Sequence, residues 1–499
     1  MQAFHNISAS FDDPNLIGVA GLVPLMRLAE RAGLHTLLEQ HLSVPSPNAA
    51  LKASSVIGGM LAGADSIDDC DVLRHGAMDK VFTGTRAPST LGTFLRAFTF
   101  GHVRQLDAVA SRTLAGLVTV VPQVLAGATD PDGIAFVDID DTMREAHGYR
   151  KQGVEYGYNR VKGLNAQVVT VSSPTCAPLV AGARLRKGNV VSGHGAATLL
   201  TSSIATVRTA GVTGQVMVRA DSGYYRHDLV TAAVRAKAWF SVTARMDSAV
   251  KKAIAGIPDT AWVPINYPNA IWDEQEQRWI SSAHLAETPF TAFTSYPKAS
   301  QVTCRLVVRR VERLGPAARA ALPKAATTPP KSSDTTSDTG SEATTEDKTT
   351  DGTAPALEAI LGEQAAQPDL FTMWRHHGFV TNSTLSTADA DATHRDHAII
   401  EQVISELKNA ALAHLPSGRF HANGAWLALS CIAFNIMRTA GAAASVRHAK
   451  ARWATLQTHL VAVPARISSS ARRMVLHMPT QWPWQDAWHN LWAVATAHT

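Results

Sequence analysis

The spacing of apolar residues divides the chain into a helical beginning, a mixed middle part and a helical end. Apolar residues recur every three or four positions in residues 16–42 and again in 86–98, a pattern that predicts amphipathic helices. The second stretch begins with a Pro-Ser pair, which is typical of a helix start. We therefore predict a helical N-terminal region over residues 1–127.

The middle of the chain, residues 128–245, alternates β-branched runs with helical ones. Three strand-like runs come first, and a helix, a strand, a helix and a strand follow. This order predicts an α/β fold in which an RNase H-like mixed sheet forms the core. The predicted strands are 133–146, 166–173, 178–185, 216–225 and 239–245, and the predicted helices are 189–211 and 227–238.

Residues 246–385 carry short β-like runs and predict a β-rich insertion into the core. Within it, residues 323–354 hold six acids and no aromatic residue, so they cannot bury enough apolar surface to offset the entropy of ordering. A disordered loop is therefore predicted at about 316–356. Helical spacing then returns: residues 386–440 are predicted to complete the core, and 441–499 to form a basic helical C-terminal region.

Composition narrows the class of protein. The 499 residues are 45% hydrophobic and 17% charged, which excludes wholesale disorder and fibrous repeats. The four cysteines are far apart and form no CxxC pair, so neither a disulfide framework nor a zinc site is indicated. The chain begins without a signal-like stretch, and its most apolar run, Trp426–Met437, is short for a bilayer span. We expect a cytoplasmic protein without a membrane segment.

Charge is distributed unevenly along the chain. The formal net charge of +5 is mild, but residues 402–499 hold nine Lys or Arg against two acids. Basic rows usually mean only a solvated face, yet their segregation from the acids favours contact with the phosphate backbone of a nucleic acid.

Three acids stand out by position. Asp140 lies late in an apolar strand and shares a face with Asp138, and Asp221 closes a second strand. A carboxylate at the end of a buried strand is costly unless it is paired or binds a metal. The alternative is an ordinary turn-capping aspartate. Two such residues in one α/β unit favour the metal site, because adjacent strands would bring them together.

The third acid, Glu401, lies at the edge of the apolar stripe of a predicted helix. His394, His397 and Lys408 share its side of the helix, and Glu406 points about 140° away, toward solvent, at ~100° per residue. The alternative is a solvated row of charges. Three converging carboxylates would suit hard divalent cations, and two such ions can stabilise an in-line phosphoryl transfer.

Three sequence blocks resemble a known family. VDIDDT, RADSGYY and HRDHAIIEQVISELK resemble the catalytic blocks of the DDE transposases of bacterial insertion sequences. The third is similar to the Y-x2-R-x3-E-x6-K signature of cut-and-paste members. EAHGYRKQGVEYGYNRVKG and APSTLGTFLRAF resemble insertion-sequence family 1380 in particular. The resemblance extends over roughly residues 15–440.

The resemblance implies a DNA transposase and assigns its catalytic residues. The first block is similar to the family's Asp-(small)-Thr, which selects Asp140 with Thr142. Asp140, Asp221 and Glu401 would bind two Mg²⁺ ions, for which Mn²⁺ can substitute, and residues 386–440 would carry the catalytic helix. Strands would be cleaved at the terminal inverted repeats, and the freed 3′-OH would then attack target DNA.

The resemblance also implies residues that contact DNA. His394 and His397 stand where the family has Tyr and Arg, so activity is expected to be weakened or pH-sensitive, whereas Lys408 keeps its cation. In relatives that form hairpins, an aromatic residue of the insertion stacks on a flipped base. Trp374 is the candidate for that role, with core packing as its alternative.

Further candidate contacts with double-stranded DNA come from basic and polar rows. Arg309 and Arg310 belong to a basic row in the insertion. A polar helix face in the N-terminal region could read the inverted repeats, or the region could form a bundle for contacts in a homodimer. The residues concerned are Ser89, Thr90, Thr93 and Arg96 of that helix, Arg305 and Arg313 of the insertion, and Arg419, Arg438, Arg447, Arg452, Arg472 and Arg473 of the C-terminal region.

Two alternatives remain beside a bacterial transposase that is associated with the nucleoid. One is a DDE-type nuclease that cuts without strand transfer. The other is a catalytically inactive or repurposed DNA-binding relative, to which the histidines at 394 and 397 point.

Overall fold

The computed structural model describes residues 7–147, 150–266, 272–273, 278–279, 282–313, 373–470 and 473–497. The chain divides into two compact units. The first comprises residues 1–258, 287–307 and 378–499, and the second comprises 259–286 and 308–377. The disordered loop predicted at about 316–356 lies outside the described residues.

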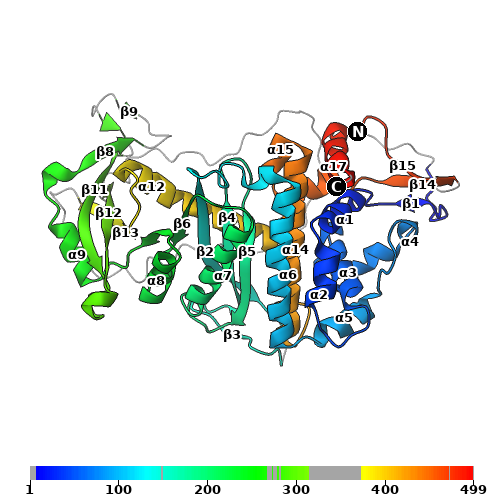
Figure 1. The fold of residues 1–499 in the computed structure, drawn as a ribbon, viewed down its shortest axis with the longest axis horizontal. Helices are drawn as coiled ribbons and strands as arrows, with labels where there is room; N and C mark the ends of the chain where they lie inside the picture. The colour runs from blue at the N-terminus through cyan, green and yellow to red at the C-terminus, as the bar shows by residue number, and fades with distance from the viewer. Residues whose placement is uncertain are drawn as a thin grey trace, which may run out of the picture. The chain divides into compact units, whose positions relative to one another are not determined.

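A mixed β-sheet forms the centre of the first unit, and its strands run in the order β5-β4-β2-β6-β7. β4 and β5 are antiparallel to their neighbours, whereas β6 runs parallel to both β2 and β7. This arrangement confirms the predicted mixed α/β core and its element order (Figure 1). The bounds are β2 Ile134–Glu145, β3 Glu155–Tyr156, β4 Lys162–Ser172, β5 Leu179–Lys187, α7 Ala196–Thr209, β6 Gln215–Ala220, α8 His227–Arg235 and β7 Trp239–Thr243.

The strand β2 lies between β4 and β6, and its sequence explains that place. Ala135, Val137 and Ile139 are fully buried, and Asp138 and Asp140 alternate with them on the other face. A strand with hydrogen-bonded neighbours on both sides satisfies its own backbone groups. β2 can therefore bring carboxylates into the interior of the sheet without exposing an edge.

The region after β7 is rich in strands. β13 pairs antiparallel with β7 through Phe379–Thr381, and β12, β11 and β8 follow in order along the same sheet. β9 and β10 form a separate two-stranded pair. The bounds are α9 Ser248–Ala255, β8 Val263–Asn266, β9 Trp272–Asp273, β10 Arg278–Trp279, β11 Ser282–Ala292, β12 Val302–Arg313 and β13 Met373–Thr381.

The N-terminal region is helical, as predicted, apart from the short strand β1. Helix α6 contacts α14 along its length, and the two lie side by side in Figure 1. Gly116 of α6 allows a close approach, because a Cβ there would collide with the carbonyl oxygen of Ala32. The bounds are β1 Leu16–Ile17, α1 Leu22–Arg31, α2 Leu34–His41, α3 Ala49–Ala62, α4 Met78–Val81, α5 Pro88–Arg96 and α6 Phe100–Val120.

Helix α14, Phe420–Ala444, forms the core of this helical layer. It has 25 residues, so the apolar run at Trp426–Met437 is only part of it. Among the described residues it is the one helix long and apolar enough to cross a membrane, but 89% of its most apolar window is buried inside the protein. Contacts with α1, α3, α6, α17 and β5 surround it, as expected for the central helix of a folded core.

The C-terminal region differs from the prediction of helices throughout. β14 and β15 form a hairpin, and β14 also pairs with β1. The reason lies in a period-two pattern: Ala465 and Ile467 are buried, and Arg466 and Ser468 between and after them are exposed. The bounds are α12 Thr387–Arg395, α13 Ile399–Lys408, α15 Val446–Ala449, α16 Trp453–Leu456, β14 Ala465–Ser470, β15 Arg473–His477 and α17 Gln485–Thr496.

The side chain of Asn435 joins α14 to β5, and we expect its loss to destabilise the fold. Its amide accepts from the Val180 N–H and donates to the Val180 carbonyl, both at 2.8 Å and both buried. Asn435→Ala leaves two buried backbone groups unsatisfied, which should lower the free energy of unfolding by about 2–4 kcal/mol. Urea denaturation measures this change. The exposed Asn409→Ala serves as the control, and an equal effect of both variants would contradict the assignment.

Candidate catalytic site

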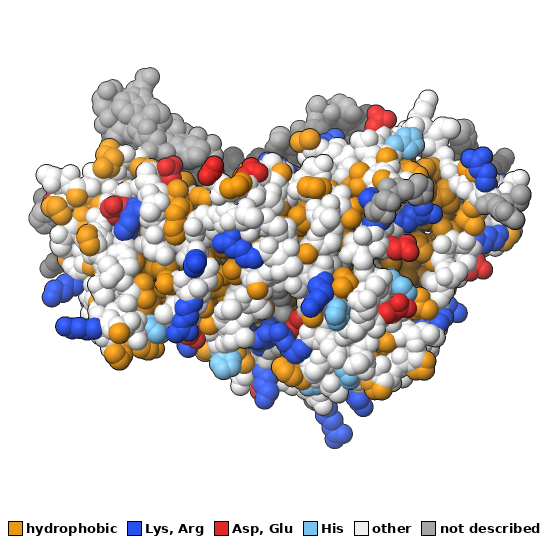
Figure 2. Space-filling model, viewed as in Figure 1, with side chains coloured by type: hydrophobic (Ala, Val, Ile, Leu, Met, Phe, Trp, Pro, Cys, Tyr) orange, Lys and Arg blue, Asp and Glu red, His pale blue; other side chains and the backbone are white. Residues whose placement is uncertain are grey.

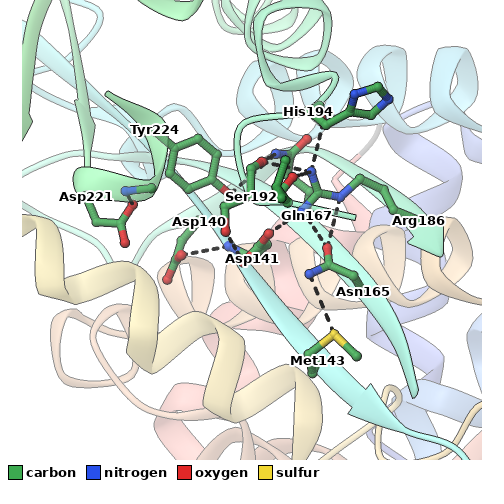
Figure 3. Close-up of polar contacts among 12 residues, drawn as sticks. Asp140, Asp141, Met143, Asn165, Gln167, Arg186, Ser192, His194, Asp221 and Tyr224 are labelled. Carbon is green, nitrogen blue, oxygen red and sulfur yellow. Dashed lines mark hydrogen bonds and ion pairs between the residues drawn. The ribbon is translucent and has the colours of Figure 1, made fainter. Parts of the chain in front are cut away.

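The ends of β2 and β6 bring two aspartates to the same level. These strands are parallel, and their pairing ends at Ile139 with Ala220, so the next residues are Asp140 and Asp221 (Figure 3). The prediction that adjacent strands bring these two together is therefore matched by the strand register. Asp221 also caps the short turn 222–224, because the Gly223 N–H donates to its Oδ1 at 3.0 Å. The turn-capping role and the place at the strand end coexist in this residue.

Three aspartates follow within four positions of β2, and two of them have arginine partners. Asp138 is fully buried, and its oxygens accept from Arg219 Nε at 2.7 Å and Nη2 at 2.8 Å. Asp141 points to the opposite face and forms an ion pair with Arg186. In the part of the chain that the structure describes, no Lys or Arg forms an ion pair with Asp140, which accepts a hydrogen bond from the Asp141 N–H at 2.7 Å.

The pKa values of these carboxyls follow from their partners. Burial, together with the charges of Asp221 and Asp141, raises the pKa of Asp140 to about 7. Burial likewise raises the pKa of Asp221. At Asp138 burial is outweighed by Arg219 and His397, which hold its pKa below the ordinary value. Asp140, which is half-buried, and Asp221, which is exposed, are therefore an acidic pair whose charge is not compensated by a neighbouring arginine.

His397 lies close to this acidic pair. Its Nδ1 is 3.2 Å from Asp138 Oδ1, and its charge lowers the pKa of both Asp140 and Asp221. The residue belongs to the short turn 396–398 that leads into α13, and α13 contacts β2. Of the predicted third block, His397 is the residue that the structure brings to the two strand ends.

Glu401 lies one helical turn beyond His397 and is exposed. In the described residues, no hydrogen bond or ion pair joins Glu401 to Asp140 or Asp221. Within the same residues, no three His, Cys, Asp or Glu side chains lie close enough to hold a metal ion. The structure therefore brings together two of the three predicted carboxylates, and the third is on the adjacent helix.

A polar network behind Asp140 was not predicted from the sequence. The buried Arg186 of β5 donates to Asn165 Oδ1 at 2.9 Å and to the carbonyls of Ser192 and His194, both at 2.8 Å (Figure 3). Together with its ion pair to Asp141, these bonds fix the loop after β5 beside β2. The available sequence signal was the alternation of Arg184 and Arg186 in a strand that is otherwise apolar.

His394, predicted to contact DNA, is held by other side chains of the protein. Its Nδ1 lies 2.9 Å from Ser241 Oγ, its Nε2 lies 3.0 Å from Thr243 Oγ1, and its ring stacks on Phe379 at 4.1 Å. Both ring nitrogens thus have partners in β7. Lys408 is half-buried in the last turn of α13, where a cation is favourable for the helix dipole.

Glu406 does not point toward solvent, as the helical wheel predicted. It is buried, and its Oε2 accepts from Arg438 Nη2 at 2.7 Å and from the Trp453 N–H at 2.7 Å. The apolar stripe of α13 identifies only one of the two sides on which the helix is packed, because α14 covers the other side, which carries Glu406. Arg438, predicted as part of a basic surface row, is consequently buried in this ion pair.

The predicted DNA contacts in the second unit are also engaged with protein. The Arg310 guanidinium lies 4.3 Å from the Trp262 ring centroid and 4.5 Å from that of Trp374. Trp374 also meets the edge of His284 at 5.0 Å between ring centroids. Arg309 is half-buried and likewise has contacts within the protein. As placed, Trp374 packs on a cation of its own chain.

Fold and site together define a mixed α/β protein with an uncompensated carboxylate pair at the ends of neighbouring parallel strands. The sequence matches the family described as Transposase DDE domain group 1 over residues 2–314 and 365–498, which is most of the chain. The protein therefore belongs to this family of DDE transposases, which confirms that part of the predicted resemblance. Membership implies a nucleic-acid-cleaving enzyme that binds DNA. No match was found among curated proteins.

We expect Asp140→Asn to stabilise the protein in the absence of divalent ions, increasingly so as pH rises. The folded-state pKa of about 7 exceeds the ordinary value of 3.8, so the folded state holds a proton that the unfolded chain has released between those values. Wild-type stability attributable to Asp140 therefore falls from about pH 4 to pH 7 and then levels. The difference between variant and wild type should reach about 2–4 kcal/mol above pH 7.

Urea denaturation of both proteins at several pH values between 4 and 8 measures this difference. The exposed Asp132→Asn is the matched control and should show no such trend. A gap between Asp140→Asn and wild type that stays constant with pH would rule out a raised pKa at Asp140.

Proposed function

We propose that this protein is a divalent-metal-dependent DNA transposase that cuts its element at the terminal inverted repeats and joins the 3′-OH ends to target DNA. The observation that carries the proposal is that Asp140 and Asp221 follow directly after the last paired residues of two neighbouring parallel strands, and that no arginine compensates their charge. The strand order β5-β4-β2-β6-β7, with helices between the parallel strands, supports an RNase H-like core. Family membership supports transposition as the biological role.

The two strand-end carboxylates fit a divalent cation. They offer oxygen ligands only, and burial together with mutual repulsion raises the pKa of Asp140, so a bound cation would relieve an unfavourable charge. Asp140, Asp221 and, as the proposed third ligand, Glu401 would hold two Mg²⁺ or Mn²⁺ ions. Bound there, such ions supply Lewis-acid stabilisation of the attacking and leaving oxygens.

The chain's own residues orient the site. Asp140 is fixed by the Asp141 N–H, and Asp141 is in turn anchored by Arg186. Asp221 is fixed by the Gly223 N–H. His397, close to both acids, can donate a hydrogen bond to a phosphate oxygen, although it lacks the forked geometry of arginine. Phosphoryl transfer depends mostly on such positioning and on charge stabilisation.

We expect Asp140→Asn, Asp221→Asn and Glu401→Gln each to abolish strand cleavage while end-binding persists, because each removes a proposed ligand and leaves the fold intact. The substrate is linear DNA that carries both flanks of the coding sequence, incubated with Mg²⁺. Each variant should cut at least ~100-fold more slowly, by analogy with the loss of a charge-stabilising group. Gel analysis of cleavage and electrophoretic mobility shift measure the two properties. Asp132→Asn is the control and should cut like wild type.

The outcomes separate the proposal from its rivals. Cleavage at wild-type rate by one variant removes that residue from the site. Cutting without joining of pre-cleaved 3′-OH ends to a target plasmid would identify a nuclease. If the wild-type chain binds DNA but shows no metal-dependent cutting, the protein is an inactive relative. The hydrogen bonds of His394 to Ser241 and Thr243 favour this alternative, because they occupy both ring nitrogens.

A further inference from the structure

Asp138 and Arg219 form a buried ion pair directly behind the two strand-end aspartates. The two residues are partners in the register of β2 and β6, and Asp140 and Asp221 each follow two positions later. Residues two positions apart on a strand share a face of the sheet and lie about 6–7 Å apart. The ion pair therefore lies beside the proposed metal ligands, one step further inside the sheet.

Each nitrogen of the Arg219 guanidinium has a partner. Nε and Nη2 donate to the two oxygens of Asp138 at 2.7 and 2.8 Å, and Nη1 donates to the Thr393 carbonyl at 2.7 Å. Its Cζ lies 4.4 Å from the ring centroid of Phe136. Lys and Arg side chains lie on the surface in Figure 2, whereas Arg219 is only 2% exposed. Apolar side chains of similar volume often give an equally stable interior, so the directed hydrogen bonds of this pair are the property to explain.

Both members of the pair also reach the junction between α12 and α13. Arg219 binds the carbonyl of Thr393 near the end of α12, and Asp138 Oδ1 lies 3.2 Å from Nδ1 of His397, in the turn that leads into α13. The two contacts thus lie on either side of the end of α12. Through them, one ion pair joins both strands that carry the aspartates to the start of the helix that carries the proposed third ligand.

Packing of the turn itself contributes little to its place. None of its residues, 396–398, is buried. On one side the turn borders a cavity of about 590 Å³, whose wall also includes Phe136 of β2. β7 holds the end of α12 through His394, and α14 holds the far end of α13 through Glu406. Between these two anchors, the hydrogen bonds of the ion pair connect the turn to β2 and β6.

We propose that Asp138 and Arg219 are positioning residues that determine where the start of α13, and with it Glu401, stands relative to Asp140 and Asp221. This inference rests on the proposed function, which makes Glu401 the third ligand. Without the pair, the turn can shift toward the cavity, and the third carboxylate is no longer held in one place. Because a misplacement of about 1 Å can lower a rate ~100-fold, the pair should act on the cutting step rather than on DNA binding.

The test replaces the ion pair by apolar side chains, Asp138→Leu together with Arg219→Met. This double variant leaves no unpaired charge in the interior, so a thermal melt should find it about as stable as the wild type. It should bind duplexes that span the element's boundaries like the wild type, yet cut them roughly 10- to 100-fold more slowly at saturating DNA and Mg²⁺. In hydrogen-exchange mass spectrometry of the free protein, the amides of residues 394–402 should exchange faster than in the wild type.

The matched control is the half-buried ion pair of Arg104 with Asp107 on α6. Arg104→Met together with Asp107→Leu should cut, and exchange at residues 394–402, like the wild type. Arg219→Lys is the second test variant and serves alone if the apolar pair does not fold. It retains the positive charge, but an ammonium lacks the fork that reaches Asp138 and Thr393 together, so it should also cut at least ~10-fold more slowly.

A folded test variant that cuts at the wild-type rate, or whose amides at 394–402 exchange as in the wild type, overturns the inference. It is also overturned if slower cutting is matched by an equal loss of DNA binding, because the pair would then only support the fold. If the wild-type chain does not cut these duplexes, the proposed function itself fails, whereas faster exchange in the double variant would still show that the pair holds the turn.

Discussion

The architecture of this protein depends on how the negative charges of three aspartates on the central strand β2 are balanced. Asp138, Asp140 and Asp141 follow each other on β2, whose neighbouring apolar residues are fully buried. Burying three carboxylates together is unfavourable unless each has a partner. Arg219 of the neighbouring strand β6 forms an ion pair with Asp138, and Arg186 of β5, the strand beyond β4, forms one with Asp141. Asp140 is left without one, so the unfavourable charge is concentrated where a cation or a phosphate-bound ion can relieve it.

Helix α13 is held near both ends, to β2 at its start and to α14 near its end. At its start, His397 contacts Asp138, and near its end Glu406 forms an ion pair with Arg438 of α14. The same α14 binds the backbone of β5 through Asn435, one turn from Arg438. The long buried helix α14 thus positions α13 relative to β5. Glu401 lies on α13 between the two anchoring residues, His397 and Glu406.

Features that depend on the local pattern of apolar residues could be predicted from the sequence, whereas contacts between distant elements could not. The strand order and the pairing of Asp140 with Asp221 could be inferred, because apolar runs mark strands and neighbouring parallel strands align their ends. The burial of Glu406 could not be inferred, because a helical wheel of α13 does not show that α14 packs against the side that carries Glu406. The partners of His394 come from β7, about 150 residues away, and no periodicity encodes them. Arg186 stands just beyond the predicted strand 178–185, and nothing in the sequence identifies the acceptors that surround its guanidinium.

The two ends of the chain complete a single piece of structure. β1 pairs with β14, and Arg31 of α1 donates to the carbonyl of Val494 in α17. Leu16 and its strand partner Arg466 are therefore neighbours although almost the whole chain separates them. During synthesis on the ribosome, β1 remains without its partner until β14 has emerged. A chain that ended before β14 would leave β1 as an unpaired strand edge and would uncover the side of α1 that α17 contacts, and such surfaces favour aggregation.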